Sequence, residues 1–183
     1  MEDQRNIPQL VYLSLGSNTG DAARQLARAA FMLDGDDHTR IVSASSVYRS
    51  EPVGGIATND FYNCVLAVRT TLSPNALLRR ISVIERQLGR IRIQRWGNRS
   101  IDIDIVLFGR VRLENEYLKI PHPEFRRRNF VLIPLLELSP DMRDIDGTPL
   151  TRYTDTAEGI VARTGELTGI PTRPHCSRIR RSR

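Results

Sequence analysis

Cysteine and long apolar runs are scarce in this sequence of 183 residues. The two cysteines, Cys64 and Cys176, are too few and too far apart for a disulfide framework or a thiolate zinc cluster, so we expect Cys64 to be a core residue. No run of roughly eighteen or more apolar residues occurs, which predicts no membrane-spanning helix. The opening residues, MEDQRNIPQL, also lack the basic and then apolar pattern of a secretory signal. These absences predict a soluble, cytoplasmic protein without a membrane partner.

The glycine-rich phosphate-binding motifs G-x-x-x-x-G-K-[ST] and G-x-G-x-x-G are absent as well, so any nucleotide site must be built differently. Basic residues, in contrast, are abundant: 27 lysines and arginines against 21 acidic residues give a net charge of +6. Such an excess favours a polyanionic partner, either a nucleotide or a nucleic acid. The arginines gather at residues 90–99, at residues 126–128 and in the C-terminal tail.

Length and hydrophobic periodicity predict one domain in which strands and helices intermingle. The β-rich segments are residues 9–18, 40–53, 60–72, 99–109 and 111–120, and the helical segments are residues 19–35 and 73–90. Residues 121–140 are expected to begin as a turn and continue as a buried helix. Asp21 and Ser73 are expected N-caps, and Gly89 is an expected helix end. This pattern favours an α+β or α/β sandwich with a mixed or antiparallel sheet.

The segment RSIDIDIVLFG, residues 99–109, alternates like a β-strand but contains two aspartates. Side chains on a strand point alternately to opposite faces, so Asp102 and Asp104 share one face and three isoleucines share the other. Two carboxylates about 7 Å apart repel each other by about 2 kcal/mol at an effective dielectric constant of about 20. A divalent cation reverses this balance, and paired carboxylates without thiols favour Mg²⁺. The isoleucines are Ile101, Ile103 and Ile105.

Several arginines precede the two aspartates on a loop that can fold over them. They are Arg90, Arg92, Arg95 and Arg99. Mg²⁺ commonly shares its coordination shell with phosphate oxygens, and guanidinium groups supply fixed positive charge for a polyphosphate. The combination is typical of phosphoryl transfer.

The same residues have a second interpretation. Asp102 and Asp104 could instead form salt bridges with the nearby arginines. His122, held between two prolines, could contact a ligand or be an ordinary surface residue. Trp96 could stack on a base, close over a ligand or only anchor its loop.

A series of motifs occurs in order over about residues 9–142: LGSN, YRSEPVG, DFYN, IERQLGRIR, RWGNRSIDIDIVLFG and IPHPEFRRRNFVLIPLLELSP. Together they resemble the 6-hydroxymethyl-7,8-dihydropterin pyrophosphokinase family of folate biosynthesis. The resemblance implies a ferredoxin-like α+β sandwich with a mainly antiparallel sheet and helices packed on it. It also implies transfer of the terminal diphosphate of ATP to the hydroxymethyl group of a reduced pterin, giving AMP and the pterin diphosphate.

The resemblance assigns roles to residues by their place in these motifs. Asp102 and Asp104 would bind two Mg²⁺ ions that enter with ATP, and Arg90 and Arg99 would act on the phosphates during transfer. Two phenylalanine rings would stack on the pterin, and an asparagine amide would bond its edge. The further ATP-binding residues that it implies are Glu85, Arg92, Arg95, Ile105, His122 and Arg128. The implied pterin-binding residues are Ser50, Val53, Gly54, Phe61, Asn63, Trp96 and Phe130.

The resemblance places a pterin pyrophosphokinase domain at residues 9–147 and leaves residues 148–183 as an extension without an assigned structure. We expect the basic end of this extension to be disordered. The implied partners are ATP and the reduced hydroxymethylpterin, with no nucleic acid and no fused folate-pathway domain. Some residues depart from common family patterns near the substrates and bear on their affinity. These departures are Glu51, Phe61, Ser82, Asn98, Tyr117 and Lys119.

Two other functions are compatible with parts of the pattern. A basic RNA-binding module would have a similar size and charge, although paired carboxylates would repel a phosphate backbone. A transferase for another pterin, or a regulator without turnover, would keep the same fold. Magnesium-dependent release of AMP separates the enzyme from an RNA-binding protein, whose oligonucleotide binding would instead depend steeply on salt.

Overall fold

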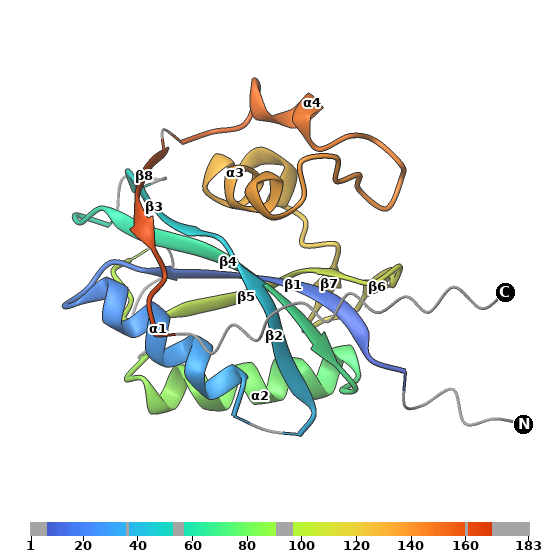
Figure 1. Cartoon of the computed structure of the whole chain (residues 1–183), viewed down its shortest axis with the longest axis horizontal. Helices are drawn as coiled ribbons and strands as arrows, with labels where there is room; N and C mark the ends of the chain where they lie inside the picture. The colour runs from blue at the N-terminus through green and yellow to red at the C-terminus, as the bar shows by residue number, and fades with distance from the viewer. Residues whose placement is uncertain (1–6, 36, 53–56, 91–96, 160, 170–183) are drawn as a thin grey trace, which may run out of the picture.

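The computed structural model describes residues 7–35, 37–52, 57–90, 97–159 and 161–169. Within these residues a sheet forms the middle layer and helices pack on both of its faces (Figure 1). The strands of this sheet are β1 (Gln9–Ser17), β2 (Thr39–Ala44), β3 (Ser46–Ser50), β4 (Phe61–Thr70), β5 (Asp102–Phe108) and β8 (Val161–Glu166). The α-helices are α1 (Ala22–Leu33), α2 (Pro74–Gln87), α3 (Asn129–Leu138) and α4 (Thr151–Thr154).

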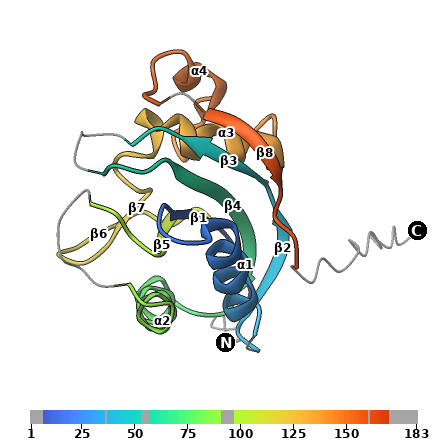
Figure 2. The ribbon, with the colours of Figure 1, turned by 90° about the vertical axis from the view of Figure 1, so that its left-hand side faces the viewer.

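The strands of the sheet are antiparallel and follow the order β5-β1-β4-β3-β8, and β2 also pairs with β4. α1 follows β1 and α2 follows β4, and both helices cover the same face of the sheet, with α3 on the other (Figure 2). β2 and β3 together occupy the position of one strand beside β4. This order is that of the ferredoxin-like α+β sandwich, so the expected fold class is confirmed.

The starts of the two long helices follow from capping residues. Asp21 Oδ1 accepts a hydrogen bond from the backbone N–H of the third residue after it at 3.0 Å, and Ser73 Oγ does the same at 3.4 Å. Pro74 occupies the first turn of α2, where its missing N–H leaves no bond unmade. Gly89, with φ of +79°, follows the end of α2. No helix in the described part of the chain is both long and apolar enough to cross a membrane.

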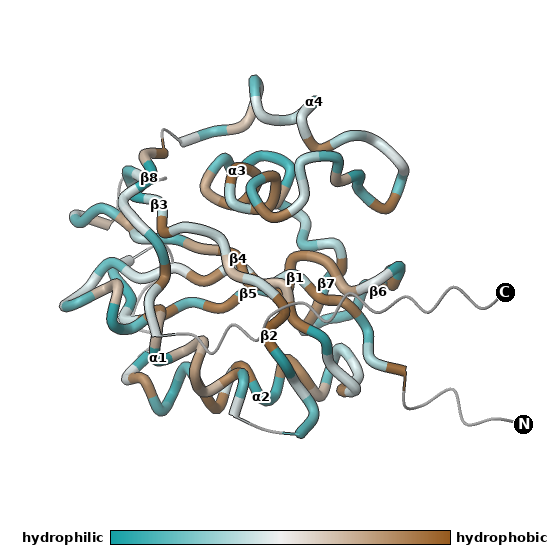
Figure 3. Tube along the Cα trace, viewed as in Figure 1, coloured by the Kyte–Doolittle hydropathy of each residue, from teal (hydrophilic) through white to brown (hydrophobic). Residues whose placement is uncertain are grey.

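The sheet separates two hydrophobic cores. Leu13 and Leu15 of β1 belong to the core beneath α1 and α2. Cys64 of β4 is fully buried in the same core, as predicted, and burial raises the pKa of its thiol to about 12. On the opposite face, Val65 of β4 and Val106 of β5 pack into the core beneath α3. The hydrophobic colouring of Figure 3 follows the central strands and α3.

Two of the expected strands are divided. The β-rich stretch at residues 40–53 forms β2 and β3, which are separated at Ser45, whose hydroxyl accepts a hydrogen bond from Val65 N at 2.9 Å. Residues 111–120 form a short hairpin of β6 (Leu113–Glu114) and β7 (Lys119–Ile120). Its turn is closed by Asn115, and such side-chain turn chemistry is not visible in an alternation pattern. The expected turn and buried helix after residue 120 are confirmed as a 3-10 helix, Phe125–Arg127, and α3.

The chain beyond residue 147 adds α4 and β8, two elements that the sequence analysis did not assign. β8 pairs with β3 and forms an edge of the sheet, and most of its residues are exposed, so it carries no apolar alternation that could have predicted it. Arg163 Nε donates to Ser46 Oγ at 2.7 Å, which joins the two strands through side chains as well as backbone. Cys176 and the basic tail lie outside the described residues.

Candidate active site

A cavity of about 320 Å³ opens on the α3 face of the sheet. Its floor consists of side chains that alternate with the core residues of three neighbouring strands, β5, β1 and β4. In one row across these strands, Gly16 of β1 lies between Asn63 of β4 and Asp102 of β5. In the next row, Ser14 of β1 pairs with Asp104. The small residues of β1 leave an open space between the polar side chains of its two neighbours.

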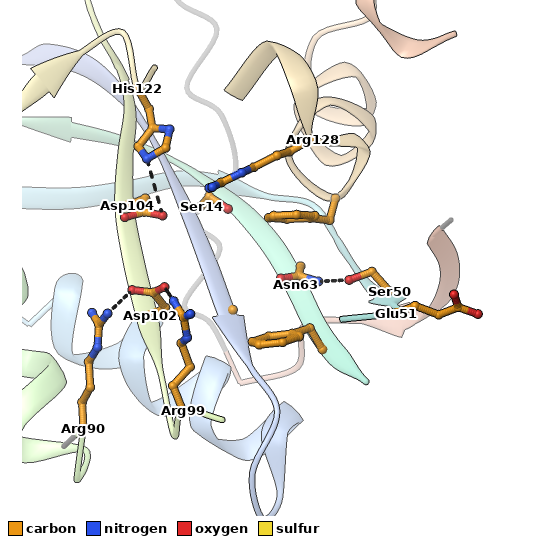
Figure 4. A pocket seen from close by; sticks show the side chains of 13 residues that line it. Ser14, Ser50, Glu51, Asn63, Arg90, Arg99, Asp102, Asp104, His122 and Arg128 are labelled. Atoms are coloured by element: carbon orange, nitrogen blue, oxygen red, sulfur yellow. Dashed lines mark hydrogen bonds and ion pairs between the residues drawn. The ribbon is translucent and has the colours of Figure 1, made fainter. Parts of the chain in front are cut away.

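The two aspartates lie side by side on β5 and face this cavity (Figure 4). The three isoleucines that alternate with them are at most 4% exposed and belong to the core beneath α1 and α2. β5 therefore has the two faces that its sequence predicts. The remaining walls come from β3, β4 and the segments before β5 and α3. Their lining residues are Ser50, Glu51, Phe61, Arg90, Arg99, His122, Arg128 and Phe130.

Both carboxylate oxygens of Asp102 have an arginine partner (Figure 4). Arg90 Nη2 lies 2.7 Å from Oδ1, and Arg99 Nη1 donates to Oδ2. These are the salt bridges that the alternative interpretation of the sequence predicts for this residue. The same contacts place two guanidinium groups beside the carboxylate pair. There the phosphate groups of a polyphosphate could replace Asp102 as the partners of both arginines.

Glu85 connects α2 to this cluster from the core side of β5. Its side chain is buried, and Oε1 accepts hydrogen bonds from Ile103 N at 2.8 Å and from Arg90 Nη1. Burial raises the pKa of Glu85, although Arg90 and the Ile103 N–H oppose that rise. Glu85 thus fixes both the strand that contains the aspartates and one arginine that pairs with Asp102.

Asp104 has different surroundings. Its Oδ2 lies 4.0 Å from His122 Nε2, above the floor of the cavity (Figure 4). Burial and the neighbouring Asp102 carboxylate raise the pKa of Asp104 to about 7, against the opposing charges of Arg128 and Arg90. Burial and Arg128 lower the pKa of His122 to about 4, so its imidazole is neutral at pH 7. The cavity floor therefore presents oxygen ligands on one side and a neutral imidazole beside them.

Phe61 and Phe130 line the same cavity from β4 and α3. Arg99 Cζ lies 5.8 Å from the centre of the Phe61 ring, and Arg128 Cζ lies 5.7 Å from that of Phe130. Asn63 is buried between the strands, and its Nδ2 donates to Ser50 Oγ at 2.9 Å (Figure 4). Two aromatic rings and a fixed amide suit a flat, polar ring system.

A second cavity of about 300 Å³ adjoins the first on the side of α2 and the β6–β7 hairpin. Asp102, Asp104, Arg90 and His122 line both cavities. The carboxylates therefore lie where two ligands could meet. Other residues of the second cavity are Ser82, Glu85, Ile105, Tyr117 and Lys119.

The carboxylate pair offers a donor set that fits Mg²⁺. Asp102 and Asp104 present hard oxygen atoms on one face of a rigid strand, and no thiol competes with them in the described cavities. Among the residues that the structure describes, no group of three or more His, Cys, Asp or Glu side chains converges as a metal site. Two protein ligands with the remaining positions left to water and phosphate oxygens are the usual arrangement for Mg²⁺.

Most of the residues that the sequence singled out lie around these two cavities. They are Ser50, Phe61, Asn63, Glu85, Arg90, Arg99, Asp102, Asp104, Ile105, His122, Arg128 and Phe130. Five others, Val53, Gly54, Arg92, Arg95 and Trp96, lie outside the described residues. Sequence reasoning missed Ser14 and Gly16, although small residues at alternate positions of an apolar strand are a signal that could have found them.

The sequence model of the family described as 7,8-dihydro-6-hydroxymethylpterin-pyrophosphokinase (HPPK) matches residues 12–140. The chain belongs to the HPPK family. It is 40% identical over 131 residues to the 2-amino-4-hydroxy-6-hydroxymethyldihydropteridine pyrophosphokinase of Haemophilus influenzae, with 72% of this chain and 82% of that protein covered. The protein of the same name from Pseudomonas aeruginosa is 42% identical over 142 residues, with coverages of 78% and 88%.

Solved structures of HPPK-DHPS proteins have a similar fold. The Plasmodium falciparum HPPK-DHPS structure matches with a TM-score of 0.65 at 16% identity and covers 84% of this chain. A structure described as HPPK-DHPS in complex with substrates matches with a TM-score of 0.67 at 14% identity and covers 82%. The match spans 45% of each of these longer chains. At such identities the similarity concerns the fold alone.

Proposed function

We propose that this HPPK-family chain transfers the terminal diphosphate of ATP to the hydroxymethyl group of 6-hydroxymethyl-7,8-dihydropterin, giving AMP and the pterin diphosphate. The observation that supports this most is that Asp102 and Asp104 line two adjoining cavities. One cavity offers aromatic rings and an amide, and the other lies beside α2. A reaction between two substrates requires that both reach the same catalytic residues, and the shared lining of the two cavities allows this.

The pterin would bind in the first cavity. Phe61 and Phe130 would stack on its two faces, because both rings line that cavity from separate elements. Asn63 would hydrogen-bond the heterocycle edge with an amide whose orientation is fixed by Ser50. This arrangement would direct the hydroxymethyl group toward Asp102.

ATP would place its adenosine in the second cavity and its phosphates near the carboxylates. The polyphosphate would compete with Asp102 for Arg90 and Arg99, since bidentate guanidinium–phosphate pairs are strong. Exchange of these partners would free the Asp102 oxygens for a cation. We assign two Mg²⁺ ions to Asp102 and Asp104, where they would neutralise phosphate charge.

Transfer of a diphosphate needs alignment and charge stabilisation more than covalent help from the protein. The stacking rings and Asn63 would hold the acceptor hydroxyl in line with the β-phosphorus. Arg90 and Arg99 would stabilise the negative charge that develops on the phosphate oxygens. His122, neutral at pH 7, would offer one N–H donor without adding charge. The resemblance adds Arg92 and Arg95 to the ATP site.

An assay of AMP release with Mg²⁺, ATP and the reduced hydroxymethylpterin tests this function. We expect AMP formation to require both Mg²⁺ and the pterin. Asp104→Asn should lower kcat/KM at least about 100-fold without lowering Tm, because a metal ligand is lost from a side chain that faces the cavity and is not part of either core. Asp141→Asn, at an exposed carboxylate outside both cavities, is the matched control. Pterin-independent hydrolysis of ATP, or full activity of Asp104→Asn, would contradict the proposal.

A further inference from the structure

We propose that Asn129 and the backbone of residues 157–159 act as a clamp that positions the cavity wall containing Arg128 and Phe130. This inference rests on the proposed function, because the wall is one side of the pterin site. Residues 157–159 lie beyond the family match, which ends at residue 140. The family comparison therefore assigns them no role.

Three hydrogen bonds join the clamp to the wall. Glu158 N donates to Arg127 O at 2.8 Å, and Asn129 N donates to Glu158 O at 2.9 Å. Asn129 Nδ2 donates to Ala157 O at 3.0 Å. Arg128 forms a parallel β-bridge with Glu158 between these bonds. These contacts fix the backbone on both sides of Arg128. They therefore determine how its side chain points into the cavity.

The same contacts fix the first turn of α3, where Phe130 follows Asn129. No side chain caps this helix, so the Glu158 carbonyl accepts one of the N–H groups that a helix start leaves unpaired. A β-carbon on Gly159 would lie 4.0 Å from Phe130 Cδ1, which places the chain at Gly159 against the ring. Gly159 has φ of +92°, a conformation that favours glycine.

Elements on both sides of the clamp hold it in place. Before it, Ala157 N donates to Tyr153 O at 2.9 Å, and the Tyr153 hydroxyl donates to Asp144 Oδ2 at 2.8 Å. After it, β8 begins at Val161, which pairs with Ser50 of β3. Figure 1 shows this part of the chain running from α4 past α3 to β8 at the edge of the sheet. The clamp therefore links the two sides of the pterin site that α3 and β3 provide.

The main consequence for catalysis concerns pterin binding, although Arg128, which the resemblance assigns to ATP, belongs to the same wall. Stacking depends on the distance and tilt of the Phe130 ring, whereas the carboxylates of β5 are held by the sheet and do not touch the clamp. A loosened clamp should weaken pterin binding and leave the chemical step intact once the site is full. Asn129 and Gly159 are thus positioning residues that act through Phe130.

Two substitutions in the full chain test the clamp, and each has a matched control. Asn129→Ala removes the bond to Ala157 O, and Gly159→Ala disfavours the left-handed backbone beside Phe130. Asn75→Ala is the control at an exposed asparagine in α2. Gly169→Ala is the control at a glycine with φ of +82° that has no atom within 4 Å of an added β-carbon. The readouts are KM for the pterin and kcat from AMP release at saturating Mg²⁺ and ATP, together with Tm.

We expect KM for the pterin to rise about three- to tenfold in both clamp variants, with kcat within about twofold of wild type and both controls unchanged. An unchanged KM in the clamp variants, whether or not Tm or kcat falls, would overturn the positioning role. If only one of the two clamp variants folds, its KM for the pterin decides the test. If the wild-type chain releases no AMP, the proposed function fails and the clamp hypothesis fails with it, whereas an active wild type with unaltered clamp variants refutes the clamp alone.

Discussion

Gly16 lies at the centre of the cavity floor, between Asn63 and Asp102. A β-carbon at this position would be 2.9 Å from Asn63 Oδ1, which is closer than van der Waals contact permits. The Asn63 amide is buried and bonded to Ser50, so it cannot move away without losing that bond. Glycine is therefore required at this position because a side chain would collide with the Asn63 amide above the strand.

We predict that Gly16→Ala raises KM for the pterin about tenfold, because the new methyl group displaces the amide that would bond the heterocycle edge. The AMP-release assay at varied pterin concentration measures this change. Gly35→Ala, where the nearest atom would lie 3.4 Å from an added β-carbon, should leave KM unchanged. Equal KM values for wild type and Gly16→Ala would show that the Asn63 amide is not placed as proposed.

The residue types at the site were largely predictable from the sequence, and their partners were predictable only in part. The alternation of RSIDIDIVLFG identified the face that Asp102 and Asp104 share, because strand periodicity depends only on local sequence. The alternative interpretation predicted salt bridges between the aspartates and the nearby arginines, and these occur at Asp102. Local sequence could not show which arginine meets which oxygen, since Arg90 reaches Asp102 from beyond the end of α2. The row that joins Gly16 to Asn63 depends on strand register, which is a long-range property.

β5 packs into the core beneath α1 and α2 with its isoleucines and lines the first cavity with its aspartates, and Ile103 and Ile105 also line the second cavity. Ile103 is 4% exposed and packs into the core beneath α1 and α2, while the neighbouring Asp104 faces the cavity. The backbone N–H of Ile103 also donates to Glu85. Substitutions at adjacent positions of this strand should therefore affect different properties.

Ile103→Ala should lower the free energy of unfolding by about 2–4 kcal/mol, because it leaves a cavity in the core but keeps the bond to Glu85. KM for the pterin should stay near that of wild type, because Ile103 lines the second cavity and not the first. Asp104→Asn should show the reverse pattern, with lost turnover and little change in stability. Urea denaturation and AMP release measure the two properties, and a loss of both in each variant would show that the faces of β5 are not independent.

The elements most readily predicted are those with local signals. α1 and α2 begin at the residues that follow the predicted N-caps, since capping needs only a side chain and a nearby N–H. β8 was not predicted because its partner, β3, lies more than a hundred residues earlier and its own residues are mostly exposed. The β6–β7 hairpin was read as one strand because its turn depends on the Asn115 side chain.

The Asp144 carboxylate joins distant parts of the molecule, the C-terminal segment and the 3-10 helix before α3. Its side chain is fully buried and accepts hydrogen bonds from Arg126 Nε at 2.9 Å, the Tyr153 hydroxyl at 2.8 Å and Thr148 N at 2.9 Å. Burial alone would raise the pKa of Asp144, but these bonds outweigh it and hold the pKa below its ordinary value of 3.8. The charged form is therefore favoured in the folded protein.

A lowered pKa makes this stabilisation dependent on pH. It is fully present well above pH 3.8, the ordinary carboxyl pKa, and is lost as the pH falls through the lower pKa of the folded state. We predict that Asp144→Asn lowers the free energy of unfolding by about 1–3 kcal/mol at pH 7 and by less at about pH 3. Thermal unfolding at both pH values measures this. A difference that widens toward pH 3 would contradict the assigned direction.

We propose above that Asp102 and Asp104 hold Mg²⁺ between ATP and the pterin. The most direct test of this proposal is a crystal structure with Mg²⁺, a non-hydrolysable ATP analogue and the reduced hydroxymethylpterin. We expect a cation about 2.1 Å from an oxygen of each aspartate, with Arg90 and Arg99 turned from Asp102 to the phosphates. A bound nucleotide with Asp102 still paired to both arginines, and no cation at either aspartate, would contradict it.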